Sequence, residues 1–351
     1  MGCFSKEAYE FVDQLEQAGQ QYWQILPLGP TGYGDSPYQS VSTFAGNPYF
    51  INLEDLIEKG LLTRGECESC DWGGSESYVD YEKMYMSRYK LLRKAYERAD
   101  LSKDEDYADF LKEEQNWLTD YCLFMAIKND QKGICWIDWP EELKDRHSKA
   151  VREAEKELEE EIDFYRFQQY CFTTQWRKLK AYANEKGISI IGDVPIYVAL
   201  DSSDAWANPE MLQFDKDHNP KSVAGCPPDA FSATGQLWGN PLYDWKKLKA
   251  TGYDWWVQRM QHCLELYDVV RIDHFRGFDE YYAIPYGETT AQKGKWEKGP
   301  GMDLFNTLNK KIENLRVIAE DLGFLTPSVL KLVKDSGFPG MKVVQFAFDS
   351  R

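Results

Sequence analysis

Short, continuous runs of apolar residues recur along the chain and predict buried strands. They lie at residues 22–28, 188–198, 267–273, 315–321 and 341–348, with YDVVRID and LRVIAED as typical examples. Strands covered on both faces of a parallel sheet read as unbroken apolar runs, whereas half-exposed strands alternate. The pattern therefore predicts about five parallel strands.

Segments with helical periodicity lie between some of these apolar runs. Residues 5–19 predict an amphipathic helix that Ser5 caps and Gly19 ends, and a later helix begins at the Thr-Pro pair 326–327 and ends at Gly337. The apolar face of the first helix consists of Ala8, Phe11, Val12, Leu15 and Ala18. Strands that alternate with helices indicate an α/β fold.

The middle of the chain has a different character. From residue 61 to residue 186 charges dominate and several helical patterns follow one another, so we expect a helical insertion there. The flanking parts, 1–60 and 187–351, then form one strand-rich domain with substrate loops. A closed (β/α)8 barrel needs eight strands, so this domain is either an open sheet or an incomplete barrel with about five of the eight.

The charge balance excludes some partners. The 351 residues carry 41 Lys and Arg against 58 Asp and Glu, a net charge of −17, and no basic stripe is present to bind phosphates. Mean hydropathy is −0.59, and no apolar run is long enough to cross a bilayer. We therefore expect neither nucleic acid nor a membrane as a partner, and the absence of a visible signal peptide predicts a cytoplasmic protein.

Cysteine usage and aromatic content add two expectations. Of the eight cysteines, only Cys67 and Cys70 have the spacing of a metal-binding pair, and a zinc site needs a second pair. We therefore expect reduced thiols, no metal and no cofactor. Aromatic residues make up 15% of the chain, with twelve tryptophans. Such rings fill cores by default, but they also stack on the faces of sugars.

Three of the predicted strands end in acidic residues. These residues are Asp193, Asp273 and the pair Glu320 and Asp321, and His274 follows the second of them. Single acids at such places are usually paired core residues or helix caps, but three on successive strands favour an active site, because the carboxyl ends of parallel strands meet. Clustered carboxylates suit a divalent metal ion or glycoside chemistry, and the aromatic surplus favours sugars.

Several long motifs of the chain resemble those of the 4-α-glucanotransferases of the amylomaltase or disproportionating-enzyme type, which are relatives of the α-amylases. The motifs stand in the family's order and cover most of the chain outside the predicted helical insertion. They are LPLGPTGYGDSPYQSVSTFAGNPY, IGDVPIYVALDSSDAW, GCPPDAFSATGQLWGNPLYDW, VVRIDHFRGF, VIAEDLG and GFPGMKVVQFAFD.

The resemblance implies a (β/α)8 barrel with insertions that transfers α-1,4-glucan segments with retention of configuration. By position within the motifs, Asp273 is the nucleophile that forms a covalent glycosyl intermediate, and Glu320 is the acid/base. We expect neighbouring Arg271 to hold the pKa of Asp273 down and an apolar setting to raise the pKa of Glu320. A retaining pair also predicts carboxyl groups about 5–6 Å apart.

The same motifs imply contacts with the substrate. Asp193 and His274 would hydrogen-bond the transferred sugar, Tyr38 would stack on it, and residues 226–238 would form a lid over the acceptor side. The implied binding residues are Tyr38, Asp193, Asp229, Gln236, Trp238, Arg271 and His274. A lid matters because an enzyme that prefers a sugar acceptor must exclude water, which is present at about 55 M.

The family pattern extends beyond this chain at both ends. It begins with a strand before the first helix and continues after VVQFAFD with strands that carry a third catalytic aspartate, and neither has a counterpart here. We therefore expect a fragment with impaired activity, whose ligands are maltooligosaccharides and other α-1,4-glucans. The alternatives are a retaining α-glucan hydrolase, a non-catalytic α-glucan-binding protein and, more distantly, a metal-dependent enzyme. The pattern leaves the oligomeric state open.

Overall fold

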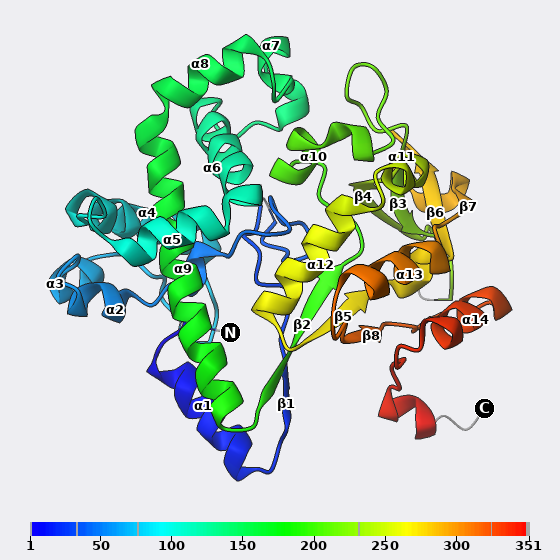
Figure 1. Cartoon of the computed structure of the whole chain (residues 1–351), viewed down its shortest axis with the longest axis horizontal. Helices are drawn as coiled ribbons and strands as arrows, with labels where there is room; N and C mark the ends of the chain where they lie inside the picture. Colours follow the sequence, from blue (N-terminus) through cyan, green and yellow to red (C-terminus); the bar gives the residue numbers. More distant parts are fainter. Residues whose placement is uncertain (1, 33, 76, 231, 324, 349–351) are drawn as a thin grey trace. The chain divides into compact units, whose positions relative to one another are not determined.

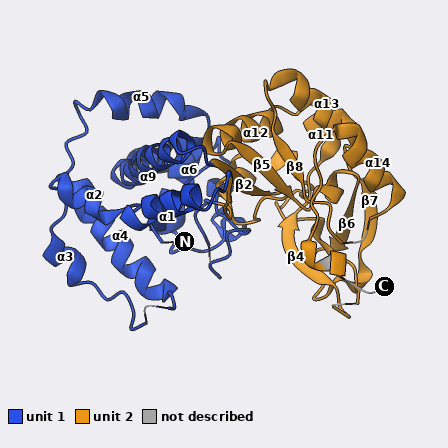
Figure 2. Cartoon of the chain, turned by 90° about the horizontal axis from the view of Figure 1, so that it is seen from below, with its two compact units in different colours: residues 1–21, 28–188 blue, residues 22–27, 189–351 orange. Residues whose placement is uncertain are grey.

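The computed structural model describes all of the chain except residues 1, 33, 76, 231, 324 and 349–351. The chain divides into two compact units (Figure 2). The helical unit comprises Met1–Gln21 and Leu28–Ile188, and the sheet unit comprises Tyr22–Pro27 and Ser189–Arg351. The predicted domain boundaries after residues 60 and 186 stay a prediction.

The sheet unit contains a four-stranded parallel sheet (Figure 1). Its strands are β1 (Tyr22–Gln24), β2 (Ser189–Pro195), β5 (Val269–Asp273) and β8 (Val317–Ala319), in the spatial order β1-β2-β5-β8. All three neighbouring pairs are parallel. The inner strands β2 and β5 hold fully buried β-branched residues, as their unbroken apolar runs predicted.

One of the five predicted strands is absent from the described part of the chain. Within the apolar run 341–348, Val344–Phe348 form a 3-10 helix, η6, whose first and last residues are 67% and 83% exposed. Among the described residues, this part of the chain approaches the sheet at Pro339, which accepts from the Ala319 N–H, and at Gly340, which forms a parallel bridge with Ala319 of β8. The prediction of a strand is wrong because a single bridge leaves this run with no sheet surface to cover it.

Strand β1 is shorter and more exposed than the apolar run 22–28 predicted. It ends at Gln24, and Tyr22 is 56% exposed. Among the described residues β1 pairs only with β2, so it is an edge strand rather than a buried one. Parallel strands and helices confirm the α/β class, and the described parallel sheet is open and has four strands instead of five.

A second sheet, which the sequence analysis did not predict, is antiparallel. Its strands are β3 (Ser222–Cys226), β4 (Gln236–Pro241), β6 (Glu280–Pro285) and β7 (Lys295–Lys298), in the order β4-β3-β6-β7. These segments contain glycine, proline and charged residues and lack the long apolar runs that marked the parallel strands. They are held by cross-strand pairing and by a small core of Val223, Tyr282, Ile284 and Ala291.

Helices complete the sheet unit. They are α10 (Ser203–Ala207), α11 (Trp245–Ala250), α12 (Asp254–Leu266), α13 (Met302–Lys311), α14 (Pro327–Ser336) and the 3-10 helices η3 (Pro209–Met211), η4 (Phe275–Phe278) and η5 (Ala291–Lys293). Helix α12 packs on β2 and β5, and α13 packs between α12 and α14. The predicted ends of α14 are confirmed: Thr326 accepts a hydrogen bond from the Val329 N–H, and Gly337 has a φ of 73°.

The helical unit is built around the long helix α9. Its helices are α1 (Lys6–Gln17), α2 (Leu53–Glu58), α3 (Arg64–Glu68), α4 (Tyr81–Arg98), α5 (Glu105–Glu113), α6 (Gln115–Asp130), α7 (Glu141–Lys144), α8 (Lys149–Glu157), α9 (Glu159–Glu185), η1 (Pro48–Phe50) and η2 (Trp136–Asp138). Helices α1, α4, α5, α6 and α8 all contact α9. The first helix begins after Ser5 and ends before Gly19 as predicted. The Ser5 hydroxyl donates to the Glu7 carboxylate and makes no cap hydrogen bond, and Phe11, placed on the apolar face, is 41% exposed.

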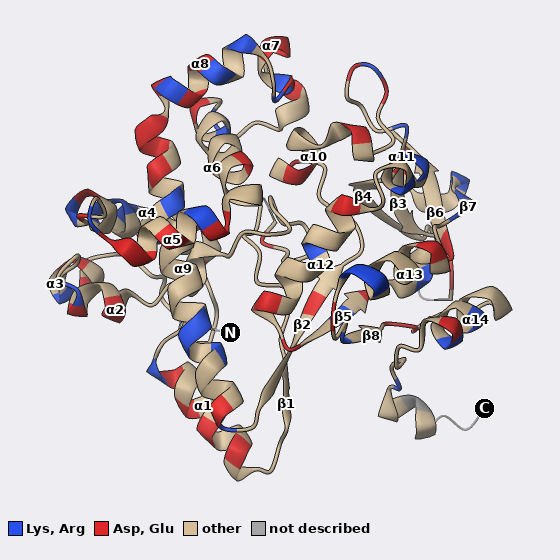
Figure 3. Cartoon of the chain, in the orientation of Figure 1, with Lys and Arg blue, Asp and Glu red and all other residues tan. Residues whose placement is uncertain are grey.

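Charged residues spread over the helices of both units (Figure 3). The acidic run that opens α9 puts three glutamates in its first turn, where the helix dipole favours negative charge. None of the helices described is long and apolar enough to span a membrane.

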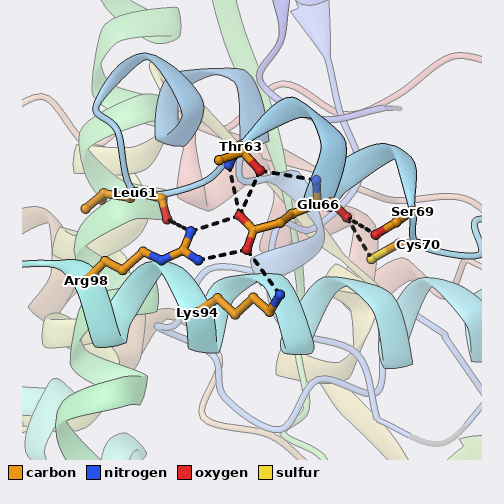
Figure 4. Close-up of polar contacts among 7 residues, drawn as sticks. All are labelled: Leu61, Thr63, Glu66, Ser69, Cys70, Lys94 and Arg98. Carbon is orange, nitrogen blue, oxygen red and sulfur yellow. Dashed lines mark hydrogen bonds and ion pairs between the residues drawn. The ribbon is translucent and has the colours of Figure 1, made fainter.

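A cluster of charged groups joins α3 to α4 (Figure 4). Glu66 accepts hydrogen bonds from Arg98 (2.7 and 2.8 Å), from Lys94 (3.1 Å) and from the N–H of Thr63 (3.0 Å). The Thr63 hydroxyl accepts from the Glu66 N–H in return, which makes a capping box at the start of α3. Arg98 and these other donors hold the pKa of Glu66 well below its usual range.

The two cysteines with metal-like spacing lie in the same segment. Cys67 and Cys70 are free thiols, and Cys70 donates to the Glu66 carbonyl over 3.5 Å (Figure 4). Burial raises the pKa of Cys67, which makes its thiolate scarce at neutral pH. Within the described residues no candidate group of metal ligands includes either cysteine.

Candidate active site

The acidic strand ends that the sequence analysis singled out lie next to one another in the sheet unit. In the register of β2 and β5, Asp193 stands opposite Arg271. Asp273 lies two residues beyond Arg271, so both side chains leave β5 on the same face. Glu320 follows β8 directly, and its N–H donates to the carbonyl of Ile272 over 3.0 Å. The ends of three neighbouring parallel strands thus bring these charged groups to one edge of the sheet.

Arg271 is shared by two carboxylates. Its Nη1 donates to Asp193 and also, over 3.0 Å, to Oδ1 of Asp273. The side chain of Asp193 is 3% exposed and that of Arg271 is 11% exposed, so this ion pair is largely removed from water. Burying one acid here without the guanidinium would leave an uncompensated charge.

Burial raises the pKa of the Asp273 carboxyl above its ordinary value, and the charge of Asp193 raises it further. Arg271 acts in the opposite direction but does not prevail. The expectation that Arg271 holds the pKa of Asp273 down is therefore wrong in its net direction. The physical reason is that desolvation penalises the charged carboxylate and that Asp193 draws on the same guanidinium.

Glu320 is a buried carboxyl held by backbone groups. Its Oε2 accepts from the N–H of His274 over 2.9 Å, and its Oε1 accepts from the N–H of Leu322 over 2.8 Å. Burial raises the pKa of Glu320, the two N–H donors oppose that shift, and the charge of Asp273 adds to it. The predicted direction for this residue is confirmed, and the two carboxyls are electrostatically coupled.

His274 has a left-handed backbone conformation and a buried imidazole nitrogen. Its backbone is left-handed, with a φ of 55°, which turns the chain sharply directly after Asp273. The Nε2 atom is buried and has no hydrogen-bond partner among the described residues. Burial, followed by the charge of Arg276, lowers the pKa of His274 to about 3. The imidazole is therefore neutral at pH 7, and its buried Nε2 is a polar atom that no described residue uses.

An aromatic wall lies beside this histidine. Trp238 of β4 meets His274 edge-on, with ring centroids 4.8 Å apart, and its ring lies 6.3 Å from that of Tyr197. The Trp238 Nε1 donates to Oε1 of Gln236 over 3.0 Å. The structure thus brings Asp193, Arg271, Asp273, His274, Glu320 and Trp238, six of the predicted site residues, into one neighbourhood of the sheet unit.

Of the three remaining predicted residues, Gln236 accepts the hydrogen bond of Trp238, Asp229 lies between β3 and β4, and Tyr38 belongs to the helical unit. Residues 226–238 begin at the last residue of β3 and end within β4, and residue 231 lies outside the described residues. Between the two strands the exposed Asp229 accepts from the N–H of Ser232 over 2.8 Å. Tyr38 belongs to the helical unit, where its N–H donates to the Ser36 hydroxyl over 3.3 Å. The lid and the stacking role of Tyr38 stay predictions.

Two side chains next to the site were not among the predicted site residues. Met341 receives a hydrogen bond from Nε of Arg271, over 3.2 Å, on its sulfur atom. Arg276 is 7% exposed and lies over the ring of Trp296, with its guanidinium carbon 4.0 Å from the centroid. The sequence could have pointed to Arg276 as a charge in VVRIDHFRG, but no local pattern places Met341 beside Arg271.

Known proteins confirm the resemblance that the motifs indicated. A family model described as 4-alpha-glucanotransferase matches residues 1–351. The chain belongs to this family. A 4-alpha-glucanotransferase of Clostridium butyricum is 52% identical over 99% of this chain and 72% of its own length. One of Thermus thermophilus is 48% identical over 99% of this chain and 70% of its own length.

Solved structures of related proteins agree with this assignment. The structure of an amylomaltase from Streptococcus agalactiae in complex with acarbose is 41% identical, with a TM-score of 0.95, and the match covers 100% of this chain and 71% of that one. An amylomaltase from Corynebacterium glutamicum, at 20% identity and a TM-score of 0.77, shares the fold. This 4-α-glucanotransferase family chain thus spans about seven-tenths of the first of these structures.

Proposed function

We propose that the carboxyl ends of strands β2, β5 and β8 form the active site of a 4-α-glucanotransferase. This enzyme moves α-1,4-glucan segments to a glucan or glucose acceptor. The observation that carries the proposal is the coupled pair of Asp273 and Glu320 at the ends of β5 and β8. Asp273 is paired with Arg271, Glu320 is held by two backbone N–H groups, and burial raises the pKa of both. A retaining glycoside reaction uses two carboxyl groups of this kind, one as the nucleophile and one as the acid/base.

The reaction proceeds in two displacements. In the first, a carboxylate oxygen of Asp273 attacks the anomeric carbon while the bond to the leaving glycosidic oxygen breaks, and Glu320 gives its proton to that oxygen. In the second, Glu320 takes the proton of an acceptor hydroxyl, whose oxygen attacks the same carbon and releases Asp273. Two inversions give net retention.

The surrounding groups suit the binding of a sugar. The buried Nε2 of His274, which no described residue contacts by a hydrogen bond, and the carboxyl of Asp193 can exchange hydrogen bonds with sugar hydroxyls, and Trp238 offers an apolar face. We assign Gln236 and Asp229 to the acceptor side, within the lid formed by residues 226–238. Arg271 completes the proposed contacts with maltooligosaccharides in the sheet unit, and the stacking role of Tyr38, which belongs to the helical unit, stays a prediction.

We also propose that the parallel sheet is part of a (β/α)8 barrel. The support is the parallel order β1-β2-β5-β8 with functional groups at the carboxyl ends of the strands, together with the shared fold of the amylomaltases. A cytoplasmic location fits an enzyme whose substrates are maltodextrins or glycogen.

Product analysis on maltotriose tests the function. The assay uses the natural protein at the full length that its gene encodes. Transfer produces longer oligosaccharides together with glucose, whereas a retaining hydrolase produces only glucose and maltose. If glucose and maltose are the only products, the transferase proposal is wrong. A chelator should leave the activity unchanged, because Arg271 already supplies the cation between Asp193 and Asp273.

A catalytic variant separates this enzyme from a glucan-binding protein. Asp273→Asn keeps the size of the side chain and removes the nucleophile, so we expect a loss of about 10⁴-fold in kcat. Binding of maltooligosaccharides, measured by calorimetry, should persist. Unchanged turnover in this variant would show that Asp273 is not the nucleophile.

A further inference from the structure

The segment after helix α14 returns to the end of β8. The N–H of Ala319 donates to the carbonyl of Pro339 over 2.9 Å, and Gly340 forms a parallel bridge with Ala319. One residue farther on, the N–H of Met341 donates to Oδ1 of Asp321 over 2.7 Å. Asp321 is 6% exposed, so its carboxyl holds this segment from a buried position. We call the hydrogen bond between the Asp321 carboxyl and the Met341 N–H the clamp.

The clamp leads directly to the arginine of the site. The sulfur of Met341 accepts from Nε of Arg271 over 3.2 Å, while Nη1 of the same guanidinium donates to Asp193 and Asp273. The guanidinium is therefore held on two of its edges, by carboxylates on one and by a thioether on the other. A thioether is a weak, uncharged acceptor, so it orients Arg271 without competing with the carboxylates for its charge.

Gly340 allows the clamp to close. A Cβ atom at this position would lie 2.7 Å from the carboxyl carbon of Asp321, closer than real Cβ contacts come. The backbone of Gly340 is not in the left-handed region. The constraint is therefore steric, and it concerns the approach of this segment to Asp321.

We propose that Asp321 is a positioning residue for the site: by holding the N–H of Met341, it places the Met341 thioether against Arg271 and so fixes the guanidinium that orients Asp273. The inference rests on the proposed function of Asp273 as the nucleophile. Asp321 itself does not touch the substrate; it acts through Met341 and Arg271.

The proposal predicts a specific change in the pH profile. The groups that act on Asp273 are Asp193, Arg271 and Glu320, and Arg271 is the one that favours its charged form. A guanidinium that drifts away would raise the pKa of Asp273 and move the acidic limb of kcat/KM to higher pH. Removing a negative charge by itself has the opposite effect, because it lowers the pKa of nearby carboxyls.

The test compares Asp321→Ala with Asp321→Asn in the full-length natural protein. In Asp321→Ala the clamp is lost, so we expect kcat to fall about 10- to 100-fold with KM nearly unchanged and the acidic limb to move to higher pH. Asp321→Asn keeps an oxygen that can accept from the Met341 N–H. It should therefore keep most of the wild-type kcat, and the acidic limb of its kcat/KM profile should lie at the wild-type pH. Asp335→Ala, at an exposed residue of α14, is the control.

Two further variants probe the other parts of the clamp. Met341→Leu keeps the volume but removes the sulfur acceptor, so it should shift the acidic limb in the same direction, whereas Met302→Leu should not. Gly340→Ala should reproduce the loss in kcat. When Asp321 is already replaced by Ala, Gly340→Ala should lower kcat only slightly further, because the carboxyl that its Cβ would meet is absent.

The outcomes distinguish the two proposals. If Asp273→Asn abolishes transfer while Asp321→Ala keeps the wild-type kcat and acidic limb, the positioning role is wrong and the function stands. If Asp321→Ala only lowers the melting temperature, with its acidic limb in place, Asp321 is merely structural. If Asp273→Asn keeps its activity, both proposals fail.

Discussion

At the scale of single residues, burial rather than the nearest charge decides the protonation of the site. Asp273 has an arginine within hydrogen-bonding distance and still has a raised pKa, because desolvation and Asp193 outweigh that contact. Glu320 receives two backbone N–H groups, and its pKa is raised as well. A sequence shows which charges are neighbours, but not how much water surrounds them.

The raised pKa of Asp273 predicts a cost in stability. An aspartate whose pKa is higher in the folded state binds more protons there, so stability falls as the pH rises from its ordinary pKa through the raised value. Asp273→Asn should therefore raise the melting temperature at pH 7 by about 1–3 °C. The gain should vanish near pH 3. Calorimetry at both pH values, with Asp335→Asn as a control, checks this, and a lower melting temperature at pH 7 would contradict it.

The buried imidazole of His274 predicts a binding role without titration. Its pKa of about 3 keeps it neutral throughout the working range. His274→Asn tolerates the left-handed backbone but moves the polar atoms, so we expect kcat/KM to fall about 10-fold, the order expected from the loss of one hydrogen bond. Neither limb of the pH profile should move. A limb near pH 6 that disappears in this variant would show that the histidine titrates.

At the scale of secondary structure, continuous apolar runs located the inner strands better than the edges. The runs at β2 and β5 became the two central strands, because both faces of these strands are covered. The run 341–348 is also apolar, but its residues 344–348 form a 3-10 helix, since among the described residues one bridge joins its approach to β8. The antiparallel sheet was missed for another reason. Its strands, of four to six residues, are longer than β1 and β8, but glycine or charged residues interrupt β3, β4 and β7, and the apolar run within β6 was not recognised.

The cluster around Glu66 predicts the behaviour of one element of the helical unit. Glu66→Ala removes the acceptor that joins α3 to Lys94 and Arg98 of α4, and it opens the capping box. We expect proteolytic cleavage between residues 60 and 80 to become several-fold faster, with only a small loss in melting temperature because the cluster is exposed. Glu68→Ala, in the same helix, is the matched control. Equal cleavage rates in the two variants would show that the cluster does not anchor α3.

The depressed pKa of Glu66 adds a pH dependence to the same contact. A glutamate whose pKa is lowered in the folded state stabilises the fold at pH values above its ordinary pKa, and this contribution is lost as the pH falls. The difference in cleavage between wild type and Glu66→Ala should therefore narrow in strong acid, when the carboxyl is protonated.

At the scale of the whole molecule, the net charge of −17 makes self-repulsion the dominant long-range electrostatic effect. Sodium chloride screens this repulsion, so the melting temperature should rise by about 1–3 °C between 10 and 300 mM salt. Sucrose at matched osmolality serves as the uncharged control. A melting temperature that falls with salt would mean that attractive ion pairs, such as those around Glu66, outweigh the repulsion.

The sequence by itself grouped the charged side chains of the proposed site and indicated the inner strands that carry them. Residues two apart on one strand share a face, and the ends of parallel strands meet, so the order of residues along the chain is enough to group Asp193, Arg271, Asp273 and Glu320. The tertiary structure decided what depends on burial and on distant segments. Only folding sets the desolvation that raises the pKa of Asp273 and brings Met341, seventy residues away, against Arg271.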